Sequence, residues 1–447
     1  MTTQSNRGGR VHTSTAAPLI LPSGVLGMNG AAGANDRYVI GAIGVGNHGR
    51  GLIGRFAAYD DVSIAAVADV DLRRAERVAA EVEAGDVYQD YRRVLERDDI
   101  DAVIEATPDH WRALIGVHAA QAGKDIYGEK PASLTIREGR RLVEAVRNNG
   151  VVYQTGSQQR STEANREACM FVRNGRLGAI KQVIVANYSS PWYYGMAGEP
   201  VPPELDWDTW CGPVMPVPYT RTGVFLMSAG QGAEPGWLMI RDFSGGLMTT
   251  WGAHGLDQMQ WALGMDASGP IEVWTEGEPF APPTYTEPED RDRGFELCTA
   301  PHVFMRYPGD IVMEFTGDSR ERMGGGLIIG EKGSIAIDRG AYAFDPPELG
   351  EEPLEDPGVV LERSEHHYRN WLDCIRTRNR PIADVEIGHR SASVCHLANI
   401  ARCVSEVTGE TGQRMEWDPA AERFTNSAWG NHFLDRPRRQ GYHLPEG

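Results

Sequence analysis

The sequence predicts an α/β protein of two domains, in which a parallel sheet covered by helices is followed by a sheet of another kind. From Tyr38 to about residue 157, buried strands alternate with helical segments, which is typical of parallel strands joined by right-handed crossovers. Beyond that point, long strands lie near one another with turns between them, which favours antiparallel pairing. A chain of 447 residues is also too long for one ordinary core.

In the N-terminal part, apolar runs mark the strands and helical periodicity marks the helices. Strands are expected at 38–46, 62–69, 101–108, 125–131 and 151–157. Helices are expected between them, at 49–58, 72–84, 110–122 and 136–148. Because each strand is followed by a helix, the strands are expected to run in the same direction.

In the C-terminal part, strands are expected at 181–190, 270–278, 302–307, 310–317 and 333–340. A single helix is expected at about 252–263, and a helical pair at about 366–407. These elements predict an α+β domain with a large, mostly antiparallel open sheet. We therefore place the first domain at 37–157 and the second, for substrate binding and oligomerisation, at 158–447, after a leader or arm at 1–36.

The charge balance limits the partners of the protein. With 44 Lys+Arg against 62 Asp+Glu, the formal net charge is −18. Such a surface repels phosphate backbones and anionic bilayers, so neither nucleic acid nor a membrane is expected as a partner. A negatively charged ligand would need a local positive site or a helix N-terminus.

The cysteines and the N-terminus bear on the compartment. Six scattered cysteines without a CxxC pair indicate buried free thiols, not a disulfide framework or a zinc site. No run of 18 apolar residues is present, which argues against a membrane span. Residues 1–36 resemble the end of a secretory signal in part, but contain no adjacent arginines. We expect a cytoplasmic protein, and periplasmic export through a functional leader is the alternative. Residues 1–36 could instead form a degenerate leader or an arm that packs on a neighbouring subunit.

A glycine-rich string follows the first strand and opens the first helix: Gly44, Gly46, Asn47, His48 and Gly49. Glycines at these places let the backbone approach a pyrophosphate, which the helix N-terminus then holds. The spacing predicts a Rossmann dinucleotide-binding domain. The alternative is a glycine turn needed only for packing.

The second strand ends at Asp69, 20 residues beyond Gly49. A carboxylate there would bind a ribose 2′-hydroxyl and repel a 2′-phosphate, which favours NAD over NADP. The nearby Arg73 and Arg74 weaken that preference.

The third and fourth strands end at the same edge of the predicted sheet, where ligands of doubly wound sheets bind. Thr107 and Pro108 end the third strand, and His110 is expected to start a helix or contact the cofactor. Glu129 and Lys130 end the fourth. The proline that follows restricts the lysine backbone to extended conformations. Burial beside a nicotinamide cation would lower the pKa of Lys130, so that it accepts a hydroxyl proton; the alternative is a structural salt bridge.

A second candidate lies on the helix expected at 252–263. His254 and Asp257 are three residues apart and are expected on one face. A carboxylate beside an imidazole sets its tautomer and raises its basicity, which suits an acid–base pair. The alternative is a structural histidine.

Together these motifs resemble the glucose–fructose oxidoreductase / inositol dehydrogenase / MocA (Gfo/Idh/MocA) family. The resemblance is carried by "GVGNHG", "ADVD", "EATPDHW", "GEKP" and "GGLMTTWGAHGLD", and "GHRSASVCHLANIA" extends it toward the C-terminus. It implies an N-terminal Rossmann domain, a C-terminal α+β domain, a nicotinamide cofactor, a sugar, polyol or glycoside substrate, and association into homodimers or homotetramers through the sheet.

Position by position, the resemblance matches Lys130 with the catalytic lysine of the family and His254 with its catalytic histidine. Many members place an aspartate four residues before that histidine, where this chain has Thr250. A threonine cannot act as a charged partner, so Asp257 or another carboxylate would have to supply that role. The paired arginines common in leaders of similar proteins are also missing.

Further contacts are expected after the last Rossmann strand. Gln158 is expected to face the cofactor, and Gln159 and Arg160 the substrate. Aromatic faces suit the C–H side of a sugar ring, so Trp192 and Tyr194 are candidates for stacking, although each is equally well explained as core or interface. His366 and His367 resemble half a metal site without fitting partners, so no metal is expected.

The leading hypothesis is an NAD-dependent oxidoreductase that transfers a hydride between a secondary hydroxyl of a sugar, polyol or glycoside and nicotinamide. The second is a redox-neutral, NAD-using glycosidase or lyase acting through a transient keto-sugar. The third is a non-catalytic sugar- or nucleotide-binding protein. The sequence leaves open which sugar is used, which hydroxyl reacts and in which direction.

Overall fold

A computed structural model describes residues 37–226, 236–287, 290–318 and 321–445. The expected leader or arm at 1–36 lies outside these residues. Among them, no helix has the length and apolarity needed to cross a bilayer. The six cysteines are free thiols, five of them buried, as expected.

The N-terminal part forms a parallel sheet of six strands in the described residues, in the order β3-β2-β1-β4-β5-β6. This order is that of a Rossmann fold. The order in which successive strands are added reverses between β1 and β4, which is the topological switch point of the sheet. The strands are β1 (Tyr38–Ile43), β2 (Val62–Ala68), β3 (Asp86–Tyr88), β4 (Ala102–Glu105), β5 (Asp125–Gly128) and β6 (Tyr153–Thr155). The helices are α1 (Asn47–Ala57), α2 (Leu72–Glu81), α3 (Arg92–Leu95), α4 (Asp109–Gln121) and α5 (Ile136–Asn148).

The predicted strands and helices of this part are confirmed, and β3 and α3 are additional. Because β3 is short and partly exposed, it carries no apolar run that sequence reading could detect. With it, the strand that leads to Lys130 is the fifth and not the fourth.

A helix from far along the chain completes the Rossmann core. Helix α11 (His367–Thr377) packs Trp371 and Leu372 against Phe56 and Tyr127. Burying a large apolar side chain stabilises a fold by roughly 1.5–3 kcal/mol. The segment after residue 366 therefore contributes to both parts of the protein.

The C-terminal part contains a sheet of nine strands in the described residues, in the order β15-β14-β13-β7-β12-β11-β9-β16-β17. Its strands are β7 (Ile180–Ala186), β9 (Glu272–Glu276), β11 (His302–Tyr307), β12 (Ile311–Gly317), β13 (Gly326–Gly330), β14 (Ser334–Asp338), β15 (Ala341–Asp345), β16 (Met415–Asp418) and β17 (Arg423–Phe424). The β7–β12 pair is parallel and the others are antiparallel. The predicted mostly antiparallel sheet is confirmed.

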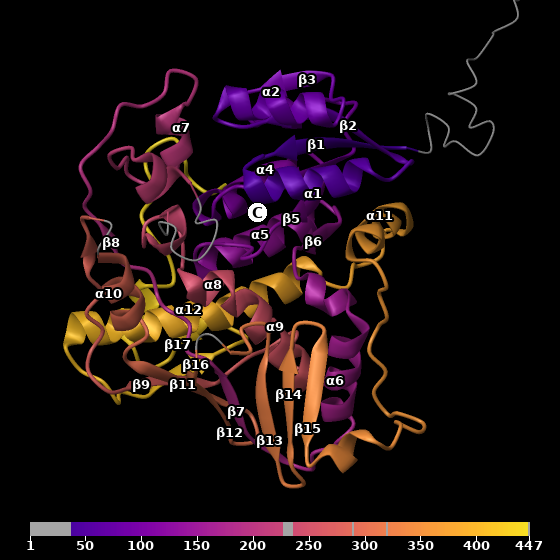
Figure 1. Ribbon diagram of the computed structural model, residues 1–447, viewed down its shortest axis with the longest axis vertical. Coiled ribbons are helices and arrows are strands. Elements are labelled where there is room, and N and C mark those ends of the chain that lie inside the picture. Colours follow the sequence, from indigo (N-terminus) through magenta and orange to yellow (C-terminus); the bar gives the residue numbers. More distant parts are fainter. Residues whose placement is uncertain (1–36, 227–235, 288–289, 319–320, 446–447) are drawn as a thin grey trace, which may run out of the picture.

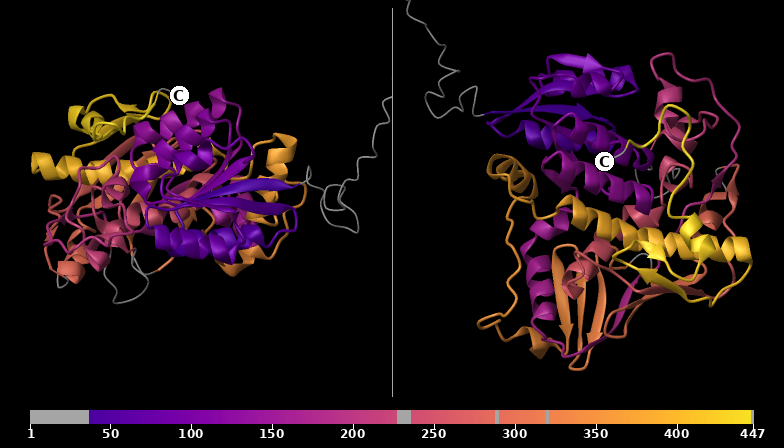
Figure 2. Two further views of the ribbon diagram at one scale, coloured as in Figure 1. Left: turned by 90° about the horizontal axis from the view of Figure 1, so that it is seen from above. Right: turned by 180° about the vertical axis from the view of Figure 1, so that it is seen from behind.

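The helices of this part are α6 (Glu163–Arg173), α7 (Trp207–Cys211), α8 (Leu247–Thr250), α9 (Gly252–Leu263), α10 (Asp290–Leu297), α12 (Val385–Thr408) and α13 (Ala428–His432). A separate pair, β8 (Tyr193–Tyr194) and β10 (Thr284–Tyr285), lies in the loop region. Helix α12 runs between the Rossmann part and the nine-stranded sheet in both views (Figures 1 and 2). Apolar residues of α6, α9 and α12 share one core with this sheet.

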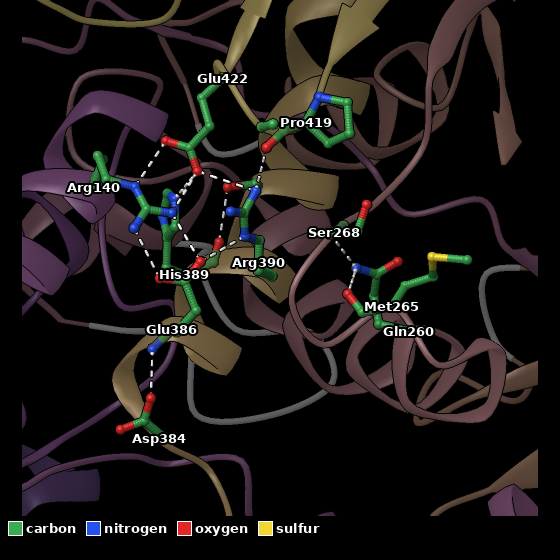
Figure 3. A network of polar contacts seen from close by, with 12 residues as sticks. Arg140, Gln260, Met265, Ser268, Asp384, Glu386, His389, Arg390, Pro419 and Glu422 are labelled. Carbon is green, nitrogen blue, oxygen red and sulfur yellow. Dashed lines mark hydrogen bonds and ion pairs between the residues drawn. The ribbon is translucent and has the colours of Figure 1, made fainter. Parts of the chain in front are cut away.

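A polar network joins α12 to the Rossmann helix α5 (Figure 3). The Arg140 guanidinium donates to both oxygens of Glu386 at 2.8 and 2.9 Å and to both oxygens of Glu422 at 2.7 and 3.0 Å. The His389 ring contacts Glu422 at 2.7 Å. Burial alone would raise the pKa of Glu422, but His389 and Arg140 outweigh it and hold that pKa well below 4.5. Bidentate arginine–carboxylate pairs are directional, so the network fixes how the two parts meet.

Candidate functional site

A pocket lies at the carboxyl edge of the Rossmann sheet, where the strand order reverses. Its walls come from the loops after β1, β2, β3 and β4, from α4 and α7, and from Phe225, Leu226 and Trp237. The predicted cofactor residues that line it are Gly44, Gly46, Asn47, His48, Gly49, Asp69, Thr107 and Pro108. Residues that sequence reading missed include Tyr91, Trp111, Trp210 and Trp237.

The glycine loop meets the requirements of a dinucleotide cradle. Gly44 has a φ of +77°, and a Cβ there would lie 2.6 Å from the Thr107 side chain. A Cβ on Gly49 would lie 2.2 Å from the Gly44 carbonyl oxygen. A Cβ added to Gly46 would have no atom closer than 3.8 Å. The backbone of Gly46 is therefore open to a ligand. Gly44 and Gly49 serve tight packing, and Gly46 between them leaves the room that a pyrophosphate needs.

Asp69 lies beside this loop and is 8% exposed. Its carboxylate accepts hydrogen bonds from the backbone N–H groups of Val45 and Asp71, both at 2.9 Å. The Arg74 guanidinium lies 3.8 Å away. Burial raises the pKa of Asp69, and Arg74 together with the two N–H groups opposes the rise. The strand end thus holds a carboxylate where a ribose hydroxyl would bind.

His110 corrects one prediction. Its ring contacts the Trp210 carbonyl oxygen at 2.9 Å and packs against Phe243, and it does not line the dinucleotide pocket. Burial lowers its pKa to about 4. The histidine starts α4 as expected, but it anchors the second domain where we expected a possible cofactor contact.

Lys130 follows β5 and is held by the chain on both sides. Upstream, the Glu129 N–H donates to the Glu105 carbonyl oxygen at 3.0 Å. Downstream, Thr135 caps α5 by accepting from the Glu138 N–H at 3.2 Å, while Glu138 accepts from the Leu134 N–H at 2.9 Å. This arrangement resembles a capping box, and it fixes the start of α5 six residues after the lysine.

Glu129 is 1% exposed and connects the lysine to the glycine loop. Its Oε1 contacts the His48 Nε2 at 2.9 Å and accepts from the Gln158 amide at 3.2 Å. Burial alone would raise its pKa, but His48, Lys130 and Arg112 outweigh burial and hold it at about 2. Glu129 is therefore ionised and already paired, so it leaves the adjacent ammonium without a direct salt bridge.

Lys130 and His254 come from the N-terminal and C-terminal parts of the chain, and the charge of Lys130 acts on His254. Burial lowers the pKa of the Lys130 ammonium, and the Glu129 charge opposes that effect. Burial also holds the pKa of His254 well below 6.5, and the charges of Lys130 and Arg339 lower it further. The His254 ring is buried, and its Nδ1 has no hydrogen-bond partner among the described residues. Perturbed groups of this kind are typical of functional sites.

The expected pairing of His254 with Asp257 is wrong. Asp257 accepts from the Arg160 Nε at 2.9 and 3.0 Å and from the Ser391 hydroxyl at 2.7 Å. Arg160 is 1% exposed and also bonds Asp266 at 2.7 Å. Arg160, which we expected to contact substrate, instead forms a buried ion pair that joins α9 to the start of α6.

Two other substrate candidates are also placed differently from the prediction. Trp192 is fully buried against Phe295, so its ring offers no free face to a sugar. Gln159 is 2% exposed and donates to the Gly324 carbonyl oxygen at 2.6 Å. Tyr194 is half-buried, with its hydroxyl 3.0 Å from that of Thr220.

Thr250 ends α8, directly before the helix that carries His254. Its N–H donates to the Gly246 carbonyl oxygen at 3.1 Å. Its side chain is half-buried.

Sequence reading missed an arginine that organises the strand ends. Arg112 donates to the Thr107 carbonyl oxygen at 3.0 Å and to the Lys130 and Pro131 carbonyl oxygens, the latter at 3.2 Å. It also lies 3.3 Å from the buried Asp109. Because the contacts with Lys130 and Pro131 join positions 18 and 19 residues apart, only the tertiary structure reveals them. No group of three or more His, Cys, Asp or Glu side chains in the described ranges is arranged to hold a metal.

A Rossmann sheet, a glycine cradle and a buried carboxylate at the second strand define a nicotinamide-dinucleotide oxidoreductase fold. The sequence pattern described as "Oxidoreductase family, NAD-binding Rossmann fold" matches residues 38–157. The pattern described as "Oxidoreductase family, C-terminal alpha/beta domain" matches residues 171–444. The chain belongs to this family, Gfo/Idh/MocA, and its cofactor is NAD.

Individual relatives agree with this assignment. The chain is 25% identical over 303 residues to the uncharacterized oxidoreductase YrbE of Bacillus subtilis, covering 68% of this chain and 74% of that protein. It is 36% identical over 105 residues to scyllo-inositol 2-dehydrogenase (NAD(+)) of the same organism, covering 24% of this chain and 31% of that protein. The structure of the WlbA dehydrogenase from Bordetella pertussis, in complex with NADH and UDP-GlcNAcA, has a TM-score of 0.57 at 20% identity, covering 86% of this chain and 99% of that one. This last similarity shows the fold.

Proposed function

We propose that the protein is an NAD-dependent dehydrogenase that oxidises a secondary hydroxyl of a sugar, polyol or glycoside. The observation that carries the proposal is Lys130, which lies two residues after β5 and has no hydrogen bond to its ammonium within the described ranges. Its pKa is lowered by burial. Its neighbour Glu129 contacts His48 of the glycine loop at 2.9 Å. These contacts support a role for Lys130 as proton acceptor near the dinucleotide cradle.

The chain's own residues would manage the proton. Bound nicotinamide supplies the acceptor for the hydride that leaves the carbinol carbon. The amine form of Lys130 accepts the hydroxyl proton as the carbon–oxygen bond gains double-bond character, and its ammonium form returns a proton in the reverse direction. His254 stays neutral because its pKa is low. Its buried Nδ1 has no hydrogen-bond partner among the described residues, and we propose that it orients the substrate hydroxyl.

We further propose a preference for NAD over NADP. The position of Asp69 at the pocket edge supports it, since a carboxylate repels a 2′-phosphate. Arg74 opposes it, because its guanidinium lies 3.8 Å from Asp69 and lines the same pocket. The preference is therefore expected to be moderate.

We also propose that the protein acts in the cytoplasm as a homodimer or homotetramer. Free thiols fit a reducing compartment. Light scattering coupled to size-exclusion chromatography measures the mass of the assembly against the 49.1 kDa of one chain.

The deciding experiment follows the near-ultraviolet absorbance of NADH when the purified protein meets NAD and a panel of sugars, polyols and alkyl glucosides. A steady, substrate-dependent rise supports the dehydrogenase. Release of the aglycone without net NADH would instead support the redox-neutral glycosidase. Binding of sugar and NAD without any chemical change would support the non-catalytic alternative.

A further inference from the structure

An arginine near Lys130 and His254, Arg339, forms no ion pair with a carboxylate among the described residues. Arg339 lies in the turn between β14 and β15. Its Nε donates to the Gln159 amide oxygen at 3.2 Å. Its guanidinium carbon lies 5.2 Å from the centre of the Trp251 ring, and that ring lies 6.1 Å from the ring of His254. These contacts direct the exposed Arg339 side chain toward the start of α9.

The two cations near His254 have no carboxylate partner among the described residues. Neither Lys130 nor Arg339 forms an ion pair there, although the field of each reaches His254. The neighbouring carboxylates are engaged elsewhere: Glu129 with His48, Asp109 with Arg112 and Ser244, Asp257 with Arg160, and Asp338 with the Gly324 and Arg339 N–H groups.

The site therefore has positive charge in excess and open hydrogen-bond donors. The Nη groups of Arg339 donate to no group in the described residues, and the nearby Thr250 carries no charge. The buried His254 Nδ1, in a ring 7% exposed, is also unpartnered. The protein as a whole carries −18, so this local excess of positive charge runs against the general field.

We propose that Arg339 binds a carboxylate of the substrate, so that the enzyme acts on sugar acids, such as aldonates or uronates, in preference to neutral sugars. The inference rests on the proposed dehydrogenase function. With Nε engaged by Gln159, the two Nη groups present parallel N–H donors, which match the two oxygens of a carboxylate. Because a phosphate monoester carries more charge and a third oxygen, it would call for further donors.

The test compares four full-length proteins: wild type, Arg339→Gln, Arg339→Lys and Arg423→Gln. NAD is added for turnover measurements, and NADH is bound for binding measurements. Arg423 is a matched control because it is exposed on β17, at the opposite edge of the nine-stranded sheet from the β14–β15 turn. D-glucuronate and D-gluconate are the acidic probes, and D-glucose and methyl glucoside the neutral ones. Turnover is followed by NADH absorbance, and binding by quenching of tryptophan fluorescence.

We expect wild type to favour the acidic probes. Arg339→Gln should raise their KM and their Kd about 10- to 100-fold, the usual effect of losing hydrogen bonds to a charged group. Values for neutral sugars and for Arg423→Gln should stay unchanged. Arg339→Lys keeps the charge without the planar fork, and should fall between the two. Added salt should weaken acid binding to wild type more than to Arg339→Gln.

The outcomes separate the two proposals. Equal turnover of acidic and neutral probes, with no selective effect of either Arg339 variant, overturns the carboxylate site and leaves the dehydrogenase intact. Arg339-dependent binding of glucuronate or gluconate without NADH formation supports the carboxylate site and overturns the dehydrogenase. If no acidic probe binds or reacts with wild type, the carboxylate site is refuted. If Arg339→Gln fails to fold, the KM of Arg339→Lys decides.

Discussion

The buried pair between Arg160 and Asp257 leads to an unusually discriminating prediction. If Asp257 were the partner of His254, as the sequence suggested, Asp257→Asn would slow turnover and leave stability intact. In the structure, Asp257 instead neutralises an arginine that is 1% exposed and lies 2.8 Å away. Asp257→Asn should therefore destabilise the protein, with little effect on the chemical step.

The expected size follows from burial. Removing one partner of a buried ion pair leaves an uncompensated charge, which costs about 3–5 kcal/mol. Asp266 also bonds Arg160 and offsets part of that loss, so we expect about 3 kcal/mol. At about 2 °C per kcal/mol for a domain of this size, Tm should fall by roughly 6 °C. Asp266→Asn is the matched control: the Asp266 side chain is 34% exposed, and partly exposed pairs contribute about 1 kcal/mol or less.

Two assays distinguish the explanations. Circular dichroism during heating measures Tm for wild type, Asp257→Asn and Asp266→Asn. NADH formation at a temperature well below every Tm measures kcat with the best substrate from the panel. An unchanged Tm combined with a loss of kcat of about 100-fold or more, the range expected for general acid–base catalysis, would refute the structural role.

Three further predictions concern the cofactor, the proton and the domain junction. Lys130→Ala should lower kcat by about 100- to 10,000-fold, while NADH fluorescence still reports cofactor binding. The wild-type rate should rise with pH through a pKa below the usual 10.5 of lysine. Turnover of Lys130→Ala equal to that of wild type would exclude Lys130 as the proton acceptor. Asp69→Ala should weaken NAD binding about 10- to 100-fold. It should also reduce the preference of the enzyme for NAD over NADP, because Arg74 remains in the pocket and can bind a 2′-phosphate; titrations with NADH and NADPH measure the two affinities. Glu422 has a pKa held below 4.5, so its contribution to stability is present above that pH and is lost as the pH falls. Urea unfolding between about pH 6 and pH 3 should therefore show a flatter pH dependence for Glu422→Gln than for wild type, and identical slopes would contradict the network in Figure 3.

The Rossmann part was predictable because its signals are local. Apolar strands, helical periodicity and the spacing from Gly49 to Asp69 lie within short windows of the chain. The place of Lys130 at a strand end follows from the same pattern, since parallel strands end at one edge of a sheet. Strand β3 escaped because three partly exposed residues carry no such signal.

The partners of the site residues were decided by tertiary contacts. A spacing of three residues leaves side chains about 60° apart around a helix, so His254 and Asp257 on α9 reach different neighbours. Asp257 meets Arg160, 97 residues away, and Arg339 reaches Gln159 across 180 residues. The sequence of an aromatic loop likewise does not reveal which ring is buried. Only the structure shows that Trp192 is buried and packs against Phe295. Spacing along the chain determined the elements and their order, whereas the choice among competing charged partners depended on which helices and strands the folded core brings together.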